Sequence, residues 1–332
     1  MIIQSQINPS QDSTEGEFNF ISHTVESSLF RNDQVMIKRD ADGNTTSSKG
    51  ISLEPIKLFV INARVMKENQ PTCDKNGFEL RHSPLVDNRL DLLDHRKVLN
   101  EYYRQCEELV AGVTGRKAYA FDHNVRSASA KNNAERVMGG QNVQGPAHLV
   151  HGDYTLRSGP ERLNQLGLPP SGNDTLKDFL PEGTSLIPEN ITREIANTGK
   201  RFGIINVWRN ISADPVVTHP MALCDAQTVE SDELVVFEIH YADRIGENYF
   251  SKHSSKHAMY YYPEMTRDET LLIKQWDSAG PLAQSNGKCS DSSDSNAPCT
   301  FSFHSAFVDS TIDEDAPDRW SIEVRCMVIY DS

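Results

Sequence analysis

Apolar residues recur with two different spacings along the chain. Between residues 90 and 113 they recur at steps of three and four, at Tyr102, Cys106 and Val110 for example. This spacing predicts one amphipathic helix, whose apolar face is expected to pack on the outside of a sheet. Gly115 is typical of the residue that ends such a helix.

Short apolar runs of strand length dominate the rest of the chain. Turn-rich connections separate these runs, with shorter helices expected at 158–167 and 189–196 and a loop at 126–144. Many short strands in series after a helical first third favour a barrel or sandwich with helices on one face. The strand candidates are 55–63, 117–125, 202–208, 221–225, 234–241, 258–262, 270–276, 300–303 and 321–329.

The domain organisation is expected to be simple, because the chain contains neither internal repeats nor a clear linker. Residues 1–50 are polar and predict an N-terminal arm with one or two edge strands. Residues 51–332 are expected to form a single domain. Two polar stretches within it, near 168–200 and 285–298, are expected to be insertions.

The charge balance limits the partners of the protein. Its 332 residues carry 33 Lys and Arg against 47 Asp and Glu, a formal net charge of −14. Nucleic acid and anionic membrane surfaces are therefore not expected, because both require a basic face. No apolar run approaches the roughly 20 residues of a membrane helix, and the first residues do not resemble a signal peptide. We expect a cytoplasmic protein with a small-molecule ligand, and the sequence leaves a homodimer open.

The six cysteines form no CxxC pair, which argues against a zinc knuckle. In a chain of this size they are expected to be reduced and mostly buried. Cys289 and Cys299 flank a polar loop and could pair only if the protein were oxidised.

Candidate metal chemistry centres on His151 and Asp153. On a strand, side chains at positions i and i+2 share one face, so this imidazole and this carboxylate would point the same way. A second imidazole would complete the 2-His-1-carboxylate triad, which binds Fe(II) and leaves the opposite coordination positions open. His148 is three residues away from His151 and is expected to face away.

Five histidines later in the chain could supply that second imidazole: His219, His240, His253, His257 and His304. His253 and His257 lie in a polar, basic run that is typical of an exposed loop. His219 precedes a proline in a turn, and His240 ends a strand without an acidic context. His304 instead closes a predicted strand and precedes the Arg319–Ser321 pair.

Arg319 and Ser321 alternate onto one face of the last predicted strand, with Arg325 further along the same face. A guanidinium beside a hydroxyl suits a dicarboxylate ligand, because it offers a charge-assisted pair. The order His-x-Asp, distant His, Arg-x-Ser is more specific than any of its parts.

These motifs resemble the family of Fe(II)/2-oxoglutarate-dependent hydroxylases and desaturases, with its CmcJ-type, AsaB-like and fungal gibberellin desaturase-like members. The resemblance covers most of residues 117–330, and the first hundred residues match it loosely. The matching runs are 121–126 (FDHNVR), 151–155 (HGDYT) with 158–162 (SGPER), 204–209 (IINVWR), 220–225 (PMALCD), 260–263 (YYYP), 271–277 (LLIKQWD), 304–307 (HSAF) and 321–325 (SIEVR).

The resemblance implies a mainly β protein with flanking helices around a double-stranded β-helix, or cupin-like jelly roll. It also implies His151, Asp153 and His304 as iron ligands, with Arg319 and Ser321 binding 2-oxoglutarate. The implied cofactors are Fe(II), 2-oxoglutarate and O2, and the coproducts are succinate and CO2. The implied activity is hydroxylation, desaturation or oxidative cyclisation of a small molecule in specialised metabolism.

Several further side chains are candidates for the substrate pocket. Asn206 and Trp208 share one face of a predicted strand and Arg209 takes the other, where it could instead pair with a surface acid. Arg126 could anchor a substrate carboxylate or lie in a solvated loop. Lys274 could bind a carboxylate or extend from the outer face. Arg325 completes this set.

Two alternative functions remain open from the sequence. One is a non-catalytic cupin-like binding protein, which would not need both the triad and the Arg319–Ser321 pair. The other is a non-haem iron oxidase that uses the triad without 2-oxoglutarate.

Overall fold

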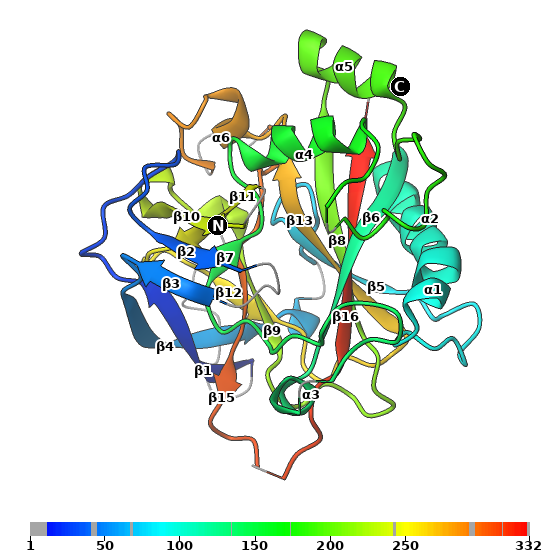
Figure 1. Cartoon of the computed structure of the whole chain (residues 1–332). Coiled ribbons are helices and arrows are strands. Elements are labelled where there is room, and N and C mark those ends of the chain that lie inside the picture. Colours follow the sequence, from blue (N-terminus) through cyan, green and yellow to red (C-terminus); the bar gives the residue numbers. More distant parts are fainter. Residues whose placement is uncertain are drawn as a thin grey trace.

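The protein is described by a computed structural model for residues 12–40, 45–66, 69–133, 135–172, 174–241, 244–291, 296–313 and 315–330 (Figure 1). It is mainly β, as the sequence predicts. Two sheets carry its sixteen labelled strands, and α2 (Tyr103–Thr114) covers the outer face of the smaller one.

The larger sheet, sheet A, has eleven strands in the order β15-β1-β4-β12-β9-β14-β7-β11-β10-β2-β3. The strands of the first fifty residues belong to it. β3 lies at its edge, as expected for this part of the chain, whereas β1 pairs on both sides. The strands are β1 (Ser13–Ile21), β2 (Met36–Arg39), β3 (Thr45–Lys49), β4 (Leu53–Asn62), β7 (His151–Gly152), β9 (Met221–Cys224), β10 (Leu234–His240), β11 (Ile245–Ser251), β12 (Met259–Tyr261), β14 (His304–Ala306) and β15 (Val308–Asp309).

The smaller sheet, sheet B, has five antiparallel strands in the order β5-β13-β8-β16-β6. Alternate residues of its central strands are apolar and buried against α2, while the others, several of them polar, face sheet A. The strands are β5 (Phe78–His82), β6 (Lys117–Arg126), β8 (Phe202–Asn210), β13 (Glu269–Asp277) and β16 (Ser321–Ile329).

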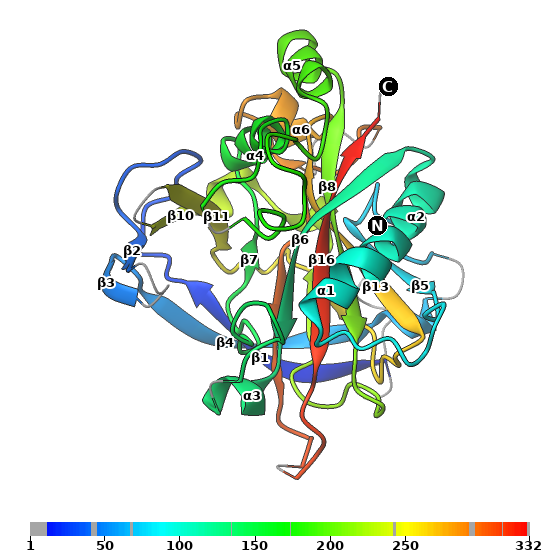
Figure 2. The ribbon, with the colours of Figure 1, turned by 45° about the vertical axis from the view of Figure 1, so that its right-hand side comes forward.

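The predicted helix at 90–113 is present, but it begins later. Asp94 caps it by accepting hydrogen bonds from the backbone N–H groups of Arg96 and Lys97. It ends at Gly115, whose φ of 67° is the left-handed conformation that favours glycine. It packs on β6, β16 and β8, on the side of sheet B that faces away from sheet A (Figure 2). Its parts are α1 (His95–Lys97), a π-helical turn η3 (Val98–Tyr102) and α2 (Tyr103–Thr114).

The shorter helices lie in the connections. Those expected at 158–167 and 189–196 are α4 and α5, and the stretch 126–144, expected as a loop, contains α3. The helices are α3 (Ala128–Asn132), α4 (Ser158–Leu166), α5 (Glu189–Thr198) and α6 (Pro281–Gln284), with 3-10 turns η2 (Ala63–Val65), η4 (Ala226–Thr228) and η5 (Ser231–Glu233).

The prediction of a strand at residues 300–303 was wrong. This stretch has no strand pairing; the N–H of Ser302 bonds to Lys274 of sheet B, while its hydroxyl bonds to Cys224 of sheet A. The segment therefore bridges the two sheets, and its strand begins at His304. Strands β5, β11 and β15 have no counterpart among the predicted runs.

Two further expectations bear on the surface of the protein. Cys289 is exposed, Cys299 is buried, and both are free thiols. Within the described ranges, no helix is long and apolar enough to cross a membrane. The expected cytoplasmic location stays a prediction.

Candidate metal centre

Two imidazoles lie close together on sheet A, where β14 runs between β9 and β7. His151 on β7 and His304 on β14 are direct partners in an antiparallel pair. Their ring centroids are 4.4 Å apart and their planes are inclined by 46°. Both side chains are nearly buried. The pairing of β7 with β14 therefore sets the separation of the two rings.

Asp153 follows β7 and brings a carboxylate to the same point. Its Oδ1 lies 3.6 Å from Nε2 of His151 and 4.0 Å from Nε2 of His304. One ligand atom from each of the three residues fits within 4.8 Å of the others. Two imidazole nitrogens and one carboxylate oxygen are the donor set of a non-haem Fe(II) site, so these residues fit iron.

The second oxygen of Asp153 is held by sheet B. Oδ2 accepts hydrogen bonds from Nδ2 of Asn206 at 3.0 Å and from Nε and Nη2 of Arg325, both at 3.3 Å. The backbone N–H of Asp153 donates to Oε1 of Gln275 at 3.1 Å. Because these partners occupy Oδ2, Oδ1 is the oxygen that faces the imidazoles. Such outer partners orient metal ligands in many metalloproteins.

The protonation states also suit metal binding. Nδ1 of His151 lies 2.6 Å from the carbonyl oxygen of Leu149. A carbonyl only accepts, so Nδ1 carries the proton and the Nε2 lone pair faces Asp153. Burial, and then the neighbouring His304, lower the pKa of His151 to about 4. Burial would raise the pKa of Asp153, but the charge of Arg325 outweighs it and the pKa lies well below its usual value. At neutral pH His151 is therefore neutral and Asp153 is ionised, which are the protonation states that bind a metal ion.

Arg319 and Ser321 lie in the interior with unused hydrogen-bonding capacity. Arg319 is 2% exposed, and its Nη1 donates to the carbonyl oxygen of His219. Nε and Nη2 of Arg319 and the hydroxyl of Ser321 are buried without a partner in the described part of the chain. Burial, and then the charge of Arg126, lower the pKa of Arg319 to about 9. Buried donors without acceptors are costly, so this arrangement suits an anionic ligand that accepts from them.

Arg126 connects the two groups. It is the cross-strand partner of Ser321, and its Nη1 donates to the carbonyl oxygen of Gly145 at 2.9 Å. Its positive charge contributes to the lowered pKa of both His304 and Arg319. The candidate metal ligands and the candidate carboxylate clamp therefore share one charged neighbour.

The remaining candidates divide between the two faces of sheet B. Trp208 lies under Arg319, whose guanidinium carbon is 5.7 Å from the centre of the indole ring. Its Nε1 is buried and, within the described ranges, has no hydrogen-bond partner. Arg209 points the other way, where it donates to the hydroxyl of Tyr102 and to two backbone carbonyls. Lys274 bonds to Asp74 and Asp277, both at 2.9 Å. Arg209 and Lys274 thus lie away from the His151–His304 pair.

Two residues that contact this centre were not among the sequence candidates. Gln275 contacts the backbone of Asp153 because β13 changes register between Lys274 and Trp276. Glu323 is buried opposite Trp208 and lies 3.4 Å from Nη2 of Arg325. A polar residue inside an apolar strand is the only signal that the sequence offers for either of them.

A second acid–histidine group lies at β10, where Asp33, Glu238 and His240 also bring ligand atoms within 4.8 Å. The Glu238 carboxylate already accepts from the N–H of Asp33 at 2.8 Å and from Nε2 of His240 at 2.9 Å. These bonds account for its burial, and the group needs no metal.

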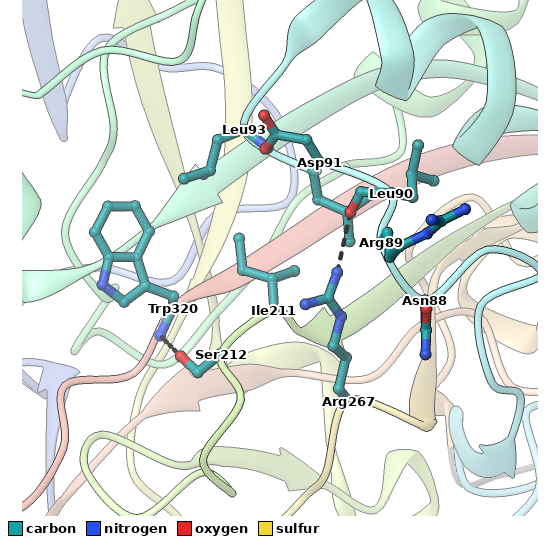
Figure 3. Close-up of a pocket in the computed structure, with 10 residues that line it drawn as sticks. Asn88, Arg89, Leu90, Asp91, Leu93, Ile211, Ser212, Arg267 and Trp320 are labelled. Atoms are coloured by element: carbon teal, nitrogen blue, oxygen red, sulfur yellow. Dashed lines mark hydrogen bonds between the residues drawn. The ribbon is translucent and has the colours of Figure 1, made fainter.

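An open cleft of about 370 Å³ lies behind the Arg319–Ser321 pair (Figure 3). Trp320, Ile211 and Leu93 form apolar walls, and Nη2 of Arg267 donates to the carbonyl oxygen of Leu90 at 3.0 Å. None of the three candidate metal ligands lines it.

Comparisons with known proteins agree with this chemistry. A family model described as "Oxidoreductase/YMDC permease-like domain" matches residues 18–329. An uncharacterized protein of Methylophilus leisingeri, from the dcmA 3' region, is 43% identical over 212 residues, which are 64% of this chain and 97% of that protein. The hydroxylase/desaturase efuI of Hormonema carpetanum is 26% identical over 292 residues, which are 82% of this chain and 83% of that protein.

The Fe(II)/2-oxoglutarate-dependent dioxygenase nvfI of Aspergillus novofumigatus is 28% identical over 250 residues, covering 74% of this chain and 72% of that protein. A solved structure of the iron and alpha-ketoglutarate-dependent endoperoxidase NvfI superposes with a TM-score of 0.69 at 20% identity, covering 97% of this chain and 100% of that one. The chain belongs to the Fe(II)/2-oxoglutarate-dependent hydroxylase/desaturase family, which confirms the resemblance predicted from its motifs.

Proposed function

We propose that this protein is an Fe(II)/2-oxoglutarate-dependent oxygenase that hydroxylates, desaturates or oxidatively cyclises a small molecule. The observation that carries the proposal is the presence of two complementary sets of side chains in one interior. His151, Asp153 and His304 bring ligand atoms within 4.8 Å of one another, and Arg319 and Ser321 hold buried donors that no described residue accepts from. Iron and the distal carboxylate of 2-oxoglutarate would satisfy both.

The proposed architecture is a double-stranded β-helix, with sheet B as one wall and the central strands of sheet A as the other. The mainly β fold and the likeness to the NvfI structure support it. In such a barrel the polar face of sheet B would line the space between the walls. Asn206, Arg325 and Gln275, which contact Asp153, lie on that face.

The roles of the residues follow from their positions. His151, Asp153 and His304 would hold Fe(II), while Arg319 and Ser321 would fix the far carboxylate of 2-oxoglutarate. When bound, iron and 2-oxoglutarate activate O2 and supply the oxidising power to remove a hydrogen atom from an unactivated C–H bond. The protein would orient the bound groups and exclude water. The three proposed ligands are nearly buried, and a water-poor interior strengthens each polar contact.

The proposed substrate is a small molecule rather than a macromolecule. Relatives named hydroxylase/desaturase support this, as does the acidic charge of the chain. Trp208 and Arg126 are the residues proposed to contact the substrate or the cosubstrate, since both lie beside the Arg319–Ser321 pair.

Turnover in the absence of substrate tests the proposal. Incubation with Fe(II), ascorbate, O2 and 2-oxoglutarate should release succinate and CO2 in equal amounts, slowly but above an Asp153→Ala variant. If iron and 2-oxoglutarate bind but no succinate forms, the protein is a binding module. If iron binds and 2-oxoglutarate does not, an iron oxidase that does not use 2-oxoglutarate replaces the proposal.

A further inference from the structure

Three neighbouring strands of sheet B place a row of polar side chains beneath Asp153. β16 lies between β6 and β8 (Figure 2). In the register of the sheet, Arg325 on β16 lies opposite Asp122 on β6 and opposite Asn206 on β8. Arg325 donates in two directions, from Nε and Nη2 to Oδ2 of Asp153 and from Nη1 to Oδ2 of Asp122 at 3.0 Å. Asp122 therefore holds the far side of the arginine that orients a metal ligand.

The other oxygen of Asp122 is bound by a segment distant in sequence. Oδ1 of Asp122 accepts a hydrogen bond from the hydroxyl of Thr175, in the stretch 168–200, where Thr175 lies between α4 and α5. The preceding residue, Asp174, pairs with Arg162 of α4, with Nη2 and Oδ1 at 3.0 Å. This segment is thus docked at two adjacent points, and one of them leads to the metal centre.

The chain of contacts runs without a gap from Thr175 through Asp122 and Arg325 to Asp153. The side chain of Arg325 is 12% exposed and that of Asp153 10% exposed. A buried guanidinium needs its anionic partners, because an uncompensated charge in the interior is strongly unfavourable. If Asp122 were absent or turned, Arg325 would keep only Asp153 and Glu323 as its anionic partners. The Arg325 guanidinium would then shift, and the direction in which Oδ1 of Asp153 points would change as a consequence.

We propose that Asp122 and Thr175 are positioning residues for the metal, acting through Arg325 on Asp153. This inference rests on the proposed binding of Fe(II) by His151, Asp153 and His304. It also links the segment 168–200 to the metal: docking of Thr175 favours the binding geometry, and bound metal favours docking of Thr175 by the same free energy.

Metal titration of the full chain without substrate tests the inference, with anaerobic Fe(II) and, separately, Co(II) as a spectroscopic probe. Thr175→Val removes one hydroxyl and keeps the shape, and should weaken metal binding by about 3- to 10-fold. Asp122→Asn should weaken it by about 10- to 100-fold, the range found for outer partners of metal ligands. Thr175→Ser should restore the affinity.

Thr184→Val is the matched control, because the Thr184 hydroxyl bonds to the carbonyl oxygen of Pro181 in the same stretch, exposed and away from Asp122. It should leave metal affinity unchanged. A folded Thr175→Val protein that binds metal as tightly as the parent chain overturns the inference. If the parent chain itself binds no metal, the proposed function fails instead.

A second readout follows the segment directly. Co(II) should slow proteolytic cleavage within 168–200 in the parent chain and in Thr184→Val. In Thr175→Val this protection should be reduced, at metal concentrations that saturate the site. Equal protection in both variants would also contradict the inference.

Discussion

His151 and His304 are direct cross-strand partners, and this single pairing places the ring centroids of the two imidazoles 4.4 Å apart. Neighbouring pairs fix the register on both sides, since His151 also lies opposite Phe250 and His304 opposite Leu223. A slip of one residue in either strand would turn one imidazole to the other face of the sheet. The candidate metal centre therefore depends on the register between β7, β14 and the strands beside them, as well as on the spacing of His151 and Asp153.

The imidazole of His304 should be essential for metal binding but not for folding. His304→Ala should lower Fe(II) affinity by more than about 100-fold, because loss of an outer partner alone costs up to that much. His253→Ala, which removes a histidine outside the centre, is the control. Metal titration and thermal unfolding measure the two effects separately. A His304→Ala protein that keeps the parent affinity would remove His304 from the ligand set.

Arg319 should contribute to the binding of 2-oxoglutarate but not to the stability of the protein without 2-oxoglutarate. Arg319→Ala should weaken 2-oxoglutarate binding by about 2 to 4 kcal/mol, the scale of breaking a buried charge-assisted pair. Arg319→Met should leave the free energy of unfolding unchanged or raise it, because two of the buried Arg319 nitrogens, Nε and Nη2, have no acceptor among the described residues. Calorimetry and urea unfolding test this, with the exposed Arg193→Ala as control. A large loss of stability in Arg319→Met would show that the guanidinium is structural.

Acid should destabilise the protein through its buried histidines. Burial lowers the pKa of His123 to about 4, and its Nδ1 lies 2.9 Å from the hydroxyl of Tyr103. Between pH 6.5 and 4 the unfolded chain binds a proton at this residue and the folded chain does not, so the free energy of unfolding falls as pH drops. The loss is on the order of 2 kcal/mol. Urea unfolding at several pH values measures this loss. The free energy of unfolding of the parent chain should exceed that of His123→Gln by less and less as the pH falls from 6.5 to 4. An advantage independent of pH would contradict the assignment.

Two glycines should respond to alanine in opposite directions. A Cβ on Gly280 would come within 2.5 Å of Cα and 2.6 Å of N of Thr300, on the segment that leads into β14. Gly280→Ala should therefore cost on the order of 2 kcal/mol or more. Gly112 lies on the exposed side of α2 with no atom within 4 Å of its Cβ position, so Gly112→Ala should add roughly 0.5 to 1 kcal/mol. Thermal unfolding of both variants checks the pair.

The features that the sequence predicted are those with a local physical cause. Alternation placed Asn206 and Trp208 on one face of β8 and Arg209 on the other, and the structure has them so. The helix at 90–113 was likewise visible in its spacing, although the cap at Asp94 begins it later. The spacing of apolar residues and the positions of turn residues are local features of the sequence, so they can be recognised without knowledge of distant contacts.

The features that the sequence could not predict depend on pairing at long range. β11 carries Gly246, Glu247 and Asn248, residues of low strand propensity, and it is a strand because β10 and β7 lie on either side of it. Gln275 reaches Asp153 only through the register change in β13. The contact between Thr175 and Asp122 joins residues 53 positions apart in a stretch without periodicity.

The most direct test of the account is anaerobic addition of Fe(II) and then 2-oxoglutarate to the metal-free protein. Chelation of iron by 2-oxoglutarate in such a centre gives a weak visible metal-to-ligand charge-transfer band. This band should form in the parent chain, be absent in His304→Ala, and need much more 2-oxoglutarate in Arg319→Ala. Iron that binds at His151, Asp153 and His304 without any band would contradict the 2-oxoglutarate assignment, and absence of iron binding would contradict the enzyme itself.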